Sequence, residues 1–432
     1  MRRAVLPRPV PGRPPRPRPP AAERQTLDNG LRVVTVTRAT VPQIAIRLVL
    51  PAGSAADPQG HEGLASLTGG LLLEGTEALS AYELHRRLDW LGASLTVQVG
   101  HDFAEVDLLL LKETLPEGID LLADILVHAA FPERELSRLR GETVELLEAR
   151  RDEPANVADD ALAEALFGGA HPYGLLPQGT IESVSGLERD LVVDFHRRHY
   201  RPQGAVLIAA GDLESADFVR LLDVRLGGWN GGTAHPEYPA APERPASGES
   251  RISIPWEDAT QSEIRVGGIG LPRNSSDWVT AALGNYLLGG STITGRLGAN
   301  LREDKGWTYG VRSGFSASVQ PGAWVIETAV DDDVTDAAID EIAAELTRFL
   351  EEPVPEEELR RGKDALILSL PRAFETPGRI VARLATVEAF GLPEDYWSTF
   401  PERVEAVTPE ELRRVARTLF DPARLVTVSV GG

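Results

Sequence analysis

Residues 116–149 read PEGIDLLADILVHAAFPERELSRLRGETVELLEA, and residues 335–370 repeat the pattern as TDAAIDEIAAELTRFLEEPVPEEELRRGKDALILSL. A second pair of similar stretches follows, LERDLVVDFHRRHYRPQGAVLIAAGDL at 187–213 and TPEELRRVARTLFDPARLVTVSVGG at 408–432. The members of each pair lie about 220 residues apart, which is the size of one large domain. We therefore predict a duplicated domain and not a solenoid of short repeats.

Strand patterns lie on both sides of the helical block in the first copy. Residues 24–39 contain the tight-turn signal Asp28-Asn29-Gly30 between two strand-like runs. Residues 94–112 contain two more strands with a turn at Gly100–Asp102, and residues 204–213 return as a strand after the helices. Adjacent strands that pair as hairpins around a block of helices are typical of an α+β domain.

The organisation that follows is two homologous α+β domains, each an antiparallel-rich sheet packed with helices. We predict that the first covers residues 24–228 and the second residues 251–432. Residues 229–250 are rich in Gly, Pro, Ala and Glu with little hydrophobic periodicity, which is typical of an interdomain linker. Residues 1–23 form a Pro- and Arg-rich arm that we predict to be disordered, because polyproline-prone basic segments bury little apolar surface.

The composition excludes several classes of protein. The net charge of −21 makes nucleic acid an unlikely partner and disfavours binding to anionic membranes. The absence of cysteine excludes disulfides, thiol catalysis and zinc–cysteine sites. No run approaches the roughly 20 apolar residues of a membrane span, and the basic start lacks the apolar core of a signal peptide. We therefore expect a cytoplasmic protein.

Five segments in order carry a resemblance to a known family. They are LDNGLRVV at 27–34, GSAADPQGHEGLASLTGGLLLEGT at 53–76, ALFGGAHPYG at 165–174, HYRPQGAVLIAAGD at 199–212 and GGSTITGRLGANLREDKGWTYGVRSGF at 289–315. Together they resemble the M16 (pitrilysin/insulinase-type) zinc metallopeptidases, above all the short bacterial chains and the subunits of mitochondrial processing peptidase. The resemblance covers nearly everything after residue 24. It implies the M16/LuxS-like metallohydrolase fold.

The zinc motif of that family is degenerate in this chain. Catalytic members carry H-x-x-E-H on the helix that starts at GLA; two histidines bind Zn²⁺ and the glutamate is the general base. The resemblance places Ser66, Gly69 and Gly70 at the His, Glu and His positions. The family's third ligand, a glutamate roughly 75–80 residues further on, falls near Leu146 or Leu147. We therefore expect no metal in this chain.

Other constellations do not replace the lost site. His61 and Glu62 are adjacent in a loop and lack a second histidine at the i+4 position. His196 and His199 have helical i,i+3 spacing, but they lie in FHRRHYRPQG, which the resemblance identifies as structural, as is His171 in HPYG. The chain also contains no G-x-S-x-G elbow and no G-x-x-x-x-G-K-[ST] loop.

The segment LREDKGWTYG supplies the other half of such an active site. By resemblance, Arg302 and Tyr309 are the arginine and tyrosine that face the zinc across a closed chamber. A phenol can donate to the oxyanion of a tetrahedral intermediate, and a guanidinium fork can hold substrate carbonyls. Gly306 would let the segment leave its helix so that Tyr309 opens a strand. The alternative is a surface arginine paired with Glu303 or Asp304 and a tyrosine that merely packs on the sheet.

These expectations combine into one functional hypothesis with one rival. The chain is predicted to be the zinc-less subunit of a heterodimeric M16-type metallopeptidase, with Zn²⁺ in an H-x-x-E-H partner and a peptide or unfolded polypeptide as substrate. The rival is a catalytically inert M16-fold pseudoenzyme kept for assembly, in which the Arg/Tyr pair is a relic. The segment LLGGSTITGR at 287–296 is too short for the glycine-rich loop that reads presequences. An adjacent gene for an H-x-x-E-H chain would favour the first hypothesis.

Overall fold

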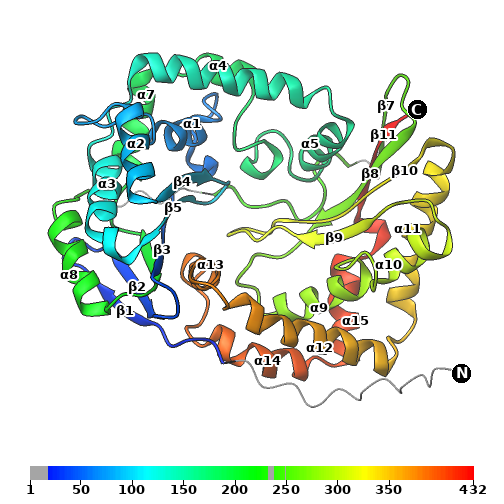
Figure 1. Ribbon diagram of the computed structural model, residues 1–432. Coiled ribbons are helices and arrows are strands. Elements are labelled where there is room, and N and C mark those ends of the chain that lie inside the picture. The colour runs from blue at the N-terminus through cyan, green and yellow to red at the C-terminus, as the bar shows by residue number, and fades with distance from the viewer. Residues whose placement is uncertain (1–17, 232–237, 249) are drawn as a thin grey trace, which may run out of the picture.

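The computed structural model describes residues 18–231, 238–248 and 250–432, and within these residues the strands form two sheets. Figure 1 shows the sheets side by side, with the first half of the chain on the left and the second half on the right. Helices pack on both sheets. The predicted α+β class, with two related sheet-and-helix units, is confirmed.

The first sheet has the order β1-β2-β6-β3-β5-β4. The pair β2–β6 is parallel and the other neighbours are antiparallel. Its strands are β1 (Glu23–Thr26), β2 (Arg32–Thr37), β3 (Gln43–Leu50), β4 (Ser94–Val99), β5 (Ala104–Leu111) and β6 (Val206–Gly211).

The second sheet has the order β7-β11-β8-β10-β9, with β7–β11 parallel and the other pairs antiparallel. Apart from the added edge strand β1, this is the order and direction of the first sheet, which supports the duplication read from the sequence. Its strands are β7 (Arg251–Pro255), β8 (Gln261–Ile269), β9 (Val311–Phe315), β10 (Ala323–Asp331) and β11 (Val426–Gly431).

Most of the helices cover one face of the sheet that belongs to their own half of the chain. In the first half they are α1 (Leu64–Leu71), α2 (Ala81–Leu91), α3 (Leu115–Val127), α4 (Glu133–Arg150), α5 (Pro154–Phe167), α6 (Ile181–Ser185), α7 (Arg189–His199) and α8 (Ser215–Leu226). In the second half they are α9 (Trp278–Leu288), α10 (Arg296–Gly298), α11 (Thr335–Glu351), α12 (Glu356–Ala373), α13 (Pro377–Ala389), α14 (Tyr396–Ala406) and α15 (Pro409–Leu419).

Two helices cross between the halves. Helix α13 of the second half packs on β3 and β6 of the first sheet, and helix α5 of the first half packs on β8 and β11 of the second. Val34, Val36 and Ile208 consequently share one buried cluster with the second-half helices. Each sheet is thus buried on one face by its own helices and on the other by a helix from the other half.

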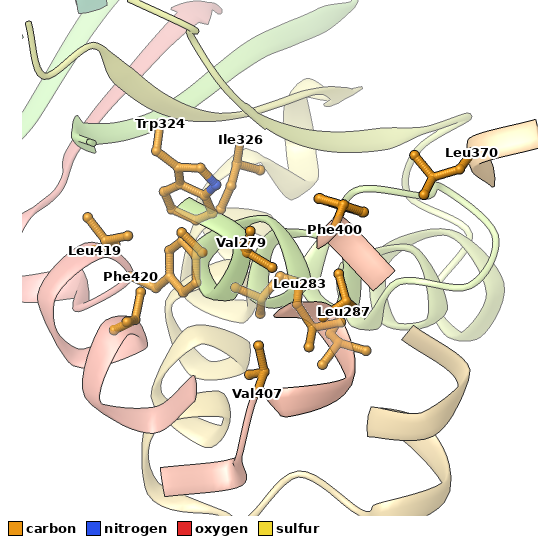
Figure 2. Packing of buried hydrophobic residues seen from close by; sticks show 14 of the residues in the cluster. Val279, Leu283, Leu287, Trp324, Ile326, Leu370, Phe400, Val407, Leu419 and Phe420 are labelled. Carbon is orange, nitrogen blue, oxygen red and sulfur yellow. The ribbon is translucent and has the colours of Figure 1, made fainter. Parts of the chain in front are cut away.

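The core of the second half shows how close packing fixes these elements. Val279, Leu283 and Leu287 recur at helical spacing on α9 (Figure 2), and Leu283 and Leu287 lie against Gly362 of α12. The rings of Trp324 and Phe420 lie 4.5 Å apart and close this core. Burial of these side chains, worth roughly 1.5–3 kcal/mol each, holds α9 against β10 and α15.

The predicted boundaries are only partly within the described residues. Of the arm predicted for 1–23, residues 1–17 lie outside the described part, while Ala22 packs against the core and Glu23 begins β1. Of the linker predicted for 229–250, residues 232–237 and 249 lie outside it, and Trp229 is buried in the core of the first half. In the described part, no helix combines the length and the apolarity that crossing a membrane requires.

Candidate functional site

Helix α1 carries the three degenerate motif positions and packs against β4, α4 and α7. It begins after Gly63, whose φ of 95° lies in the left-handed region that glycine adopts readily. Asp57 caps the helix, since its carboxylate accepts from the amides of Gly63 at 2.8 Å and Ala65 at 2.7 Å. Burial nevertheless raises the pKa of Asp57 to about 7. The sequence reasoning missed this cap, because the N-cap position itself is Gly63 and Asp57 lies six residues before it.

The position of the family's catalytic glutamate is closed by packing. A Cβ added at Gly69 would fall 2.5 Å from Cγ2 of Val99 and 3.2 Å from Cγ1 of Val97. The hydroxyl of the fully buried Tyr200 would lie 3.4 Å away. Valine side chains are stiff at χ1, so a longer side chain at Gly69 requires the strand or the helix to move.

The remaining ligand positions also fail to fit a metal. Ser66 offers only a weakly binding hydroxyl, and Gly70 has no side chain. On α4, Leu147 is buried whereas Glu145 and Glu148 are exposed. Within the described residues there is no group of three or more His, Cys, Asp or Glu side chains that could hold a metal ion. The residues present do not fit zinc.

Three of the histidines considered as replacements, His171, His196 and His199, make contacts within the first half of the chain. His196 Nε2 is hydrogen-bonded to the carbonyl of Leu126 at 3.0 Å, and burial lowers its pKa to about 4. The ring of His199 lies 4.4 Å from that of Phe195. His171 is buried, and its Nδ1 accepts from the amide of Tyr173 at 3.1 Å. These contacts are those of packing side chains.

A cavity of about 740 Å³ lies between the two halves. The β4–β5 hairpin, α5, the β9–β10 turn and α13 form its walls. On one side Asp102 joins the halves, because its carboxylate accepts from the hydroxyl of Tyr173 at 2.7 Å and from the amide of Val319 at 2.9 Å. This contact was not predicted, since nothing local in the sequence pairs residues 102 and 319.

The burial of His101 in the same hairpin predicts that the stability of the fold depends on pH. Its ring hydrogen-bonds Ser54 through Nδ1 at 3.1 Å, and burial lowers its pKa to about 4, with His171 adding to the effect. In the unfolded chain His101 therefore binds a proton near pH 6.5, whereas in the folded chain it stays neutral at that pH. Stability from this group is full above pH 6.5 and is lost as the pH falls toward 4.

We expect the free energy of unfolding to fall more between pH 7 and pH 5 in the wild type than in His101→Asn. Asparagine keeps a polar atom near the place of Nδ1 but does not titrate. The difference should be about 1–2 kcal/mol, measured by urea unfolding at both pH values. Parallel pH profiles for the two proteins would contradict this assignment.

Arg302 lies in a π-helical segment, Ala299–Asp304, that continues α10. The amide of Lys305 donates to the carbonyl of Asn300 at 3.1 Å, which is the i→i+5 bond of a π-turn. Such turns are rare and are frequent at functional sites. In the described part of the chain, the recorded charge partner of Arg302 is Glu303 at 3.6 Å, and both side chains are exposed. An exposed pair of this kind is weak, so the guanidinium is available to another molecule.

Tyr309 lies just before β9 and is 94% exposed. Gly306 has a φ of 67°, so the chain leaves the helix there as expected. In the described residues, no hydrogen bond to the Tyr309 hydroxyl is recorded. Single exposed aromatic side chains are ordinary on a protein surface, and Trp90 is 90% exposed here as well, so the exposure of Tyr309 shows that its ring is available to another molecule.

The structure does not bring the two halves of the predicted site together in one chain. Helix α1, with Ser66, Gly69 and Gly70, lies with the first sheet on the left of Figure 1. Arg302 and Tyr309 belong to the segment between α10 and β9, on the right. The pair and the degenerate motif therefore lie in different halves of the chain.

Two protein-family models match the chain. Residues 32–175 match the model described as insulinase (peptidase family M16), and residues 186–366 match the model described as the peptidase M16 inactive domain. The chain is 25% identical to an uncharacterized zinc protease of Streptomyces coelicolor over 92% of this chain and 87% of that protein. It is 27% identical to an uncharacterized zinc protease of Mycobacterium tuberculosis over 93% of this chain and 91% of that protein.

Solved structures share the fold. A peptidase M16 inactive domain from Pseudomonas fluorescens is similar with a TM-score of 0.89 and 24% identity, covering 95% of this chain and 98% of that one. A chain of complex III from Candida albicans is similar with a TM-score of 0.79 and 18% identity, covering 95% and 96%. At these identities the likeness concerns the fold.

Proposed function

This chain belongs to the M16 peptidase family, and on that premise we propose that it is the zinc-free subunit of a heterodimeric M16-type metallopeptidase. The observation that carries the proposal is a contrast within one molecule. Its motif helix offers Ser66, Gly69 and Gly70 where a metal and a base are needed, and Val99 closes the space at Gly69. Its Arg302 and Tyr309 are nevertheless present, and Tyr309 is exposed.

The chemistry assigned to the pair needs no metal in this chain. The partner supplies zinc and the nucleophile. As the scissile carbonyl becomes tetrahedral, the Tyr309 phenol donates a hydrogen bond to the oxygen on which negative charge develops. The planar fork of Arg302 holds substrate carbonyls or a carboxylate beside it. Both groups act in trans on a peptide that lies between the subunits.

The surface around the pair supports an interface. Ile293 is 68% exposed and adjoins Thr292, whose hydroxyl donates to the carbonyl of Val311 at 3.2 Å. Ile293 therefore lies next to the Tyr309 segment. Ile293 and Tyr309 are both exposed on these neighbouring segments, and a surface of this kind gains by being covered.

The alternative is an inert assembly subunit. The fold similarity to a chain of complex III favours it, since that protein is part of a large complex. In that case Arg302 and Tyr309 are surface residues without a role in turnover. The two functions therefore make opposite predictions for substitutions at Tyr309.

The first test is association with an M16 chain of similar length that carries H-x-x-E-H, sought in the neighbouring gene. Light scattering of the mixture should give the mass of one copy of each chain. Ile293→Asp should weaken the complex at least tenfold, because it buries an unpaired charge. Val224→Asp is the matched control, since Val224 is also 68% exposed but lies on α8 of the first half. A monomer that persists after the partner is added would contradict the proposal.

A further inference from the structure

The backbone on both sides of Tyr309 is held by a cluster of threonine hydroxyls. The Thr308 hydroxyl accepts from the amide of Gly310 at 3.0 Å and lies 2.9 Å from the Gly310 carbonyl. The Thr328 hydroxyl lies 2.9 Å from that of Thr308 and 3.0 Å from the same carbonyl. Thr308 and Gly310 are thus tied to each other and to Thr328, with Tyr309 between them.

The protons in this cluster suffice for a fully bonded arrangement. Each hydroxyl has one proton and can accept two hydrogen bonds. The Gly310 amide donates to Thr308, the Thr308 hydroxyl donates to the Gly310 carbonyl, and the Thr328 hydroxyl donates to either oxygen. The network is partly buried, and since a fully satisfied network is rigid, the turn has one preferred geometry.

Thr328 anchors this arrangement to the sheet. It lies on β10, is 4% exposed, and pairs with Val311 of β9 on one side and Ile264 of β8 on the other. Its position is therefore set by two neighbouring strands. The hydrogen bonds of about 3 Å among Thr328, Thr308 and Gly310 therefore fix the backbone on both sides of the exposed Tyr309 relative to the sheet.

The segment is also fixed at its other end. Glu341 of α11 accepts from the side-chain amide of Asn300 at 3.0 Å and pairs with Lys305 at 3.0 Å. The Lys305 ammonium lies 4.9 Å from the ring centre of Trp307. The backbone that carries Arg302 and Tyr309 is thus held at both ends, while the Tyr309 side chain is exposed.

We propose that Thr328 is a positioning residue for Tyr309 in the reaction of the heterodimer. The inference rests on the proposed function. A donor to an oxyanion must be held within about 0.5 Å of its productive place, and a displacement near 1 Å can cost about 10²-fold in rate. Thr328 meets that requirement through the backbone of Thr308 and Gly310, without touching the substrate.

Thr328→Val tests this, because valine keeps the shape of threonine and removes the hydroxyl. In the reconstituted heterodimer kcat should fall on the order of tenfold to a hundredfold, with KM within about twofold. Thr328→Ser, which keeps the hydroxyl, should retain most of the activity. Thr35→Val is the matched control, since Thr35 is 2% exposed on β2 and its hydroxyl lies 2.7 Å from that of Ser215. It should destabilise the fold and leave kcat unchanged.

The double variant Thr328→Val/Tyr309→Phe separates this inference from the function on which it rests. If Thr328 acts through the phenol, Tyr309→Phe alone lowers kcat and Thr328→Val adds little to it. If Tyr309→Phe lowers kcat but Thr328→Val is neutral, or multiplies the loss in full, the positioning role is wrong while the proposed function stands. If Tyr309→Phe has wild-type kcat, the proposed function itself fails.

Discussion

Replacing Tyr309 by phenylalanine is expected to lower kcat of the reconstituted heterodimer on the order of 10²–10³-fold, the usual cost of one oxyanion-hole donor. The phenyl ring stays the same, so packing and association should be unaffected. The side chain is 94% exposed in the single chain, and the substitution therefore removes no buried hydrogen bond of this fold. The measurement is steady-state cleavage of a peptide by the mixed subunits, with light scattering to confirm that the complex forms.

Two further variants define the specificity of that result. Tyr82→Phe makes the same change at another exposed tyrosine, 73% exposed on α2, and should leave kcat unchanged. Arg302→Lys keeps the charge but loses the planar fork, so it should mainly raise KM. Wild-type turnover in Tyr309→Phe would show the pair to be structural and would favour the assembly function.

The purified chain by itself is expected to hold no stoichiometric zinc and to cleave no peptide. Ser66 is a poor ligand, Gly69 and Gly70 have no side chain, and Val99 lies where a glutamate at position 69 would begin. On helix α4, which packs against α1, Leu147 is buried at the place of the third ligand. Removing every ligand and the general base should leave no measurable activity.

Elemental analysis of the chain after dialysis against a chelator checks this expectation, with the H-x-x-E-H subunit treated in parallel as the positive control. About one zinc per chain, or peptide cleavage by the chain alone that a chelator abolishes, would contradict it. Neither Tyr309→Phe nor Arg302→Lys should change the zinc content of the heterodimer, because the metal is expected in the other subunit.

Local sequence patterns accounted for the elements and for their repetition. The Asp28-Asn29-Gly30 turn lies between β1 and β2, and the strands predicted on both sides of Gly100–Asp102 are β4 and β5. The predicted duplication agrees with the shared strand order of the two sheets. The parallel pairs β2–β6 and β7–β11 were not predicted, because strands far apart in the chain carry no local signal of their partner.

The packing of α5 and α13 on the sheet of the other half could not be predicted from the sequence, for a related reason. The apolar face of a helix shows that the helix is buried but does not identify the sheet that buries it. Both helices pack on the sheet of the other half. The predicted limits at 24–228 and 251–432 therefore divide the chain along its sequence. In the folded protein, each of these two helices packs on the sheet of the other half.

The residues of the candidate site were predicted from the sequence, but the hydrogen bonds that hold their backbone were not. Arg302 and Tyr309 lie in a recognisable segment, and Gly306 ends the helix as its residue type predicts. Thr328 lies in an ordinary alternating strand, so only the fold reveals that its hydroxyl reaches Thr308. Their roles in catalysis stay a prediction.

Adding this chain to the zinc-bearing subunit tests the central claim most directly. The cleavage rate of a fixed amount of that subunit should rise with added chain and saturate at one copy of each, with all zinc in the partner. The Tyr309→Phe chain should saturate at the same ratio and give on the order of 1% of the rate or less. A partner whose cleavage rate is the same with and without this chain would contradict a shared active site.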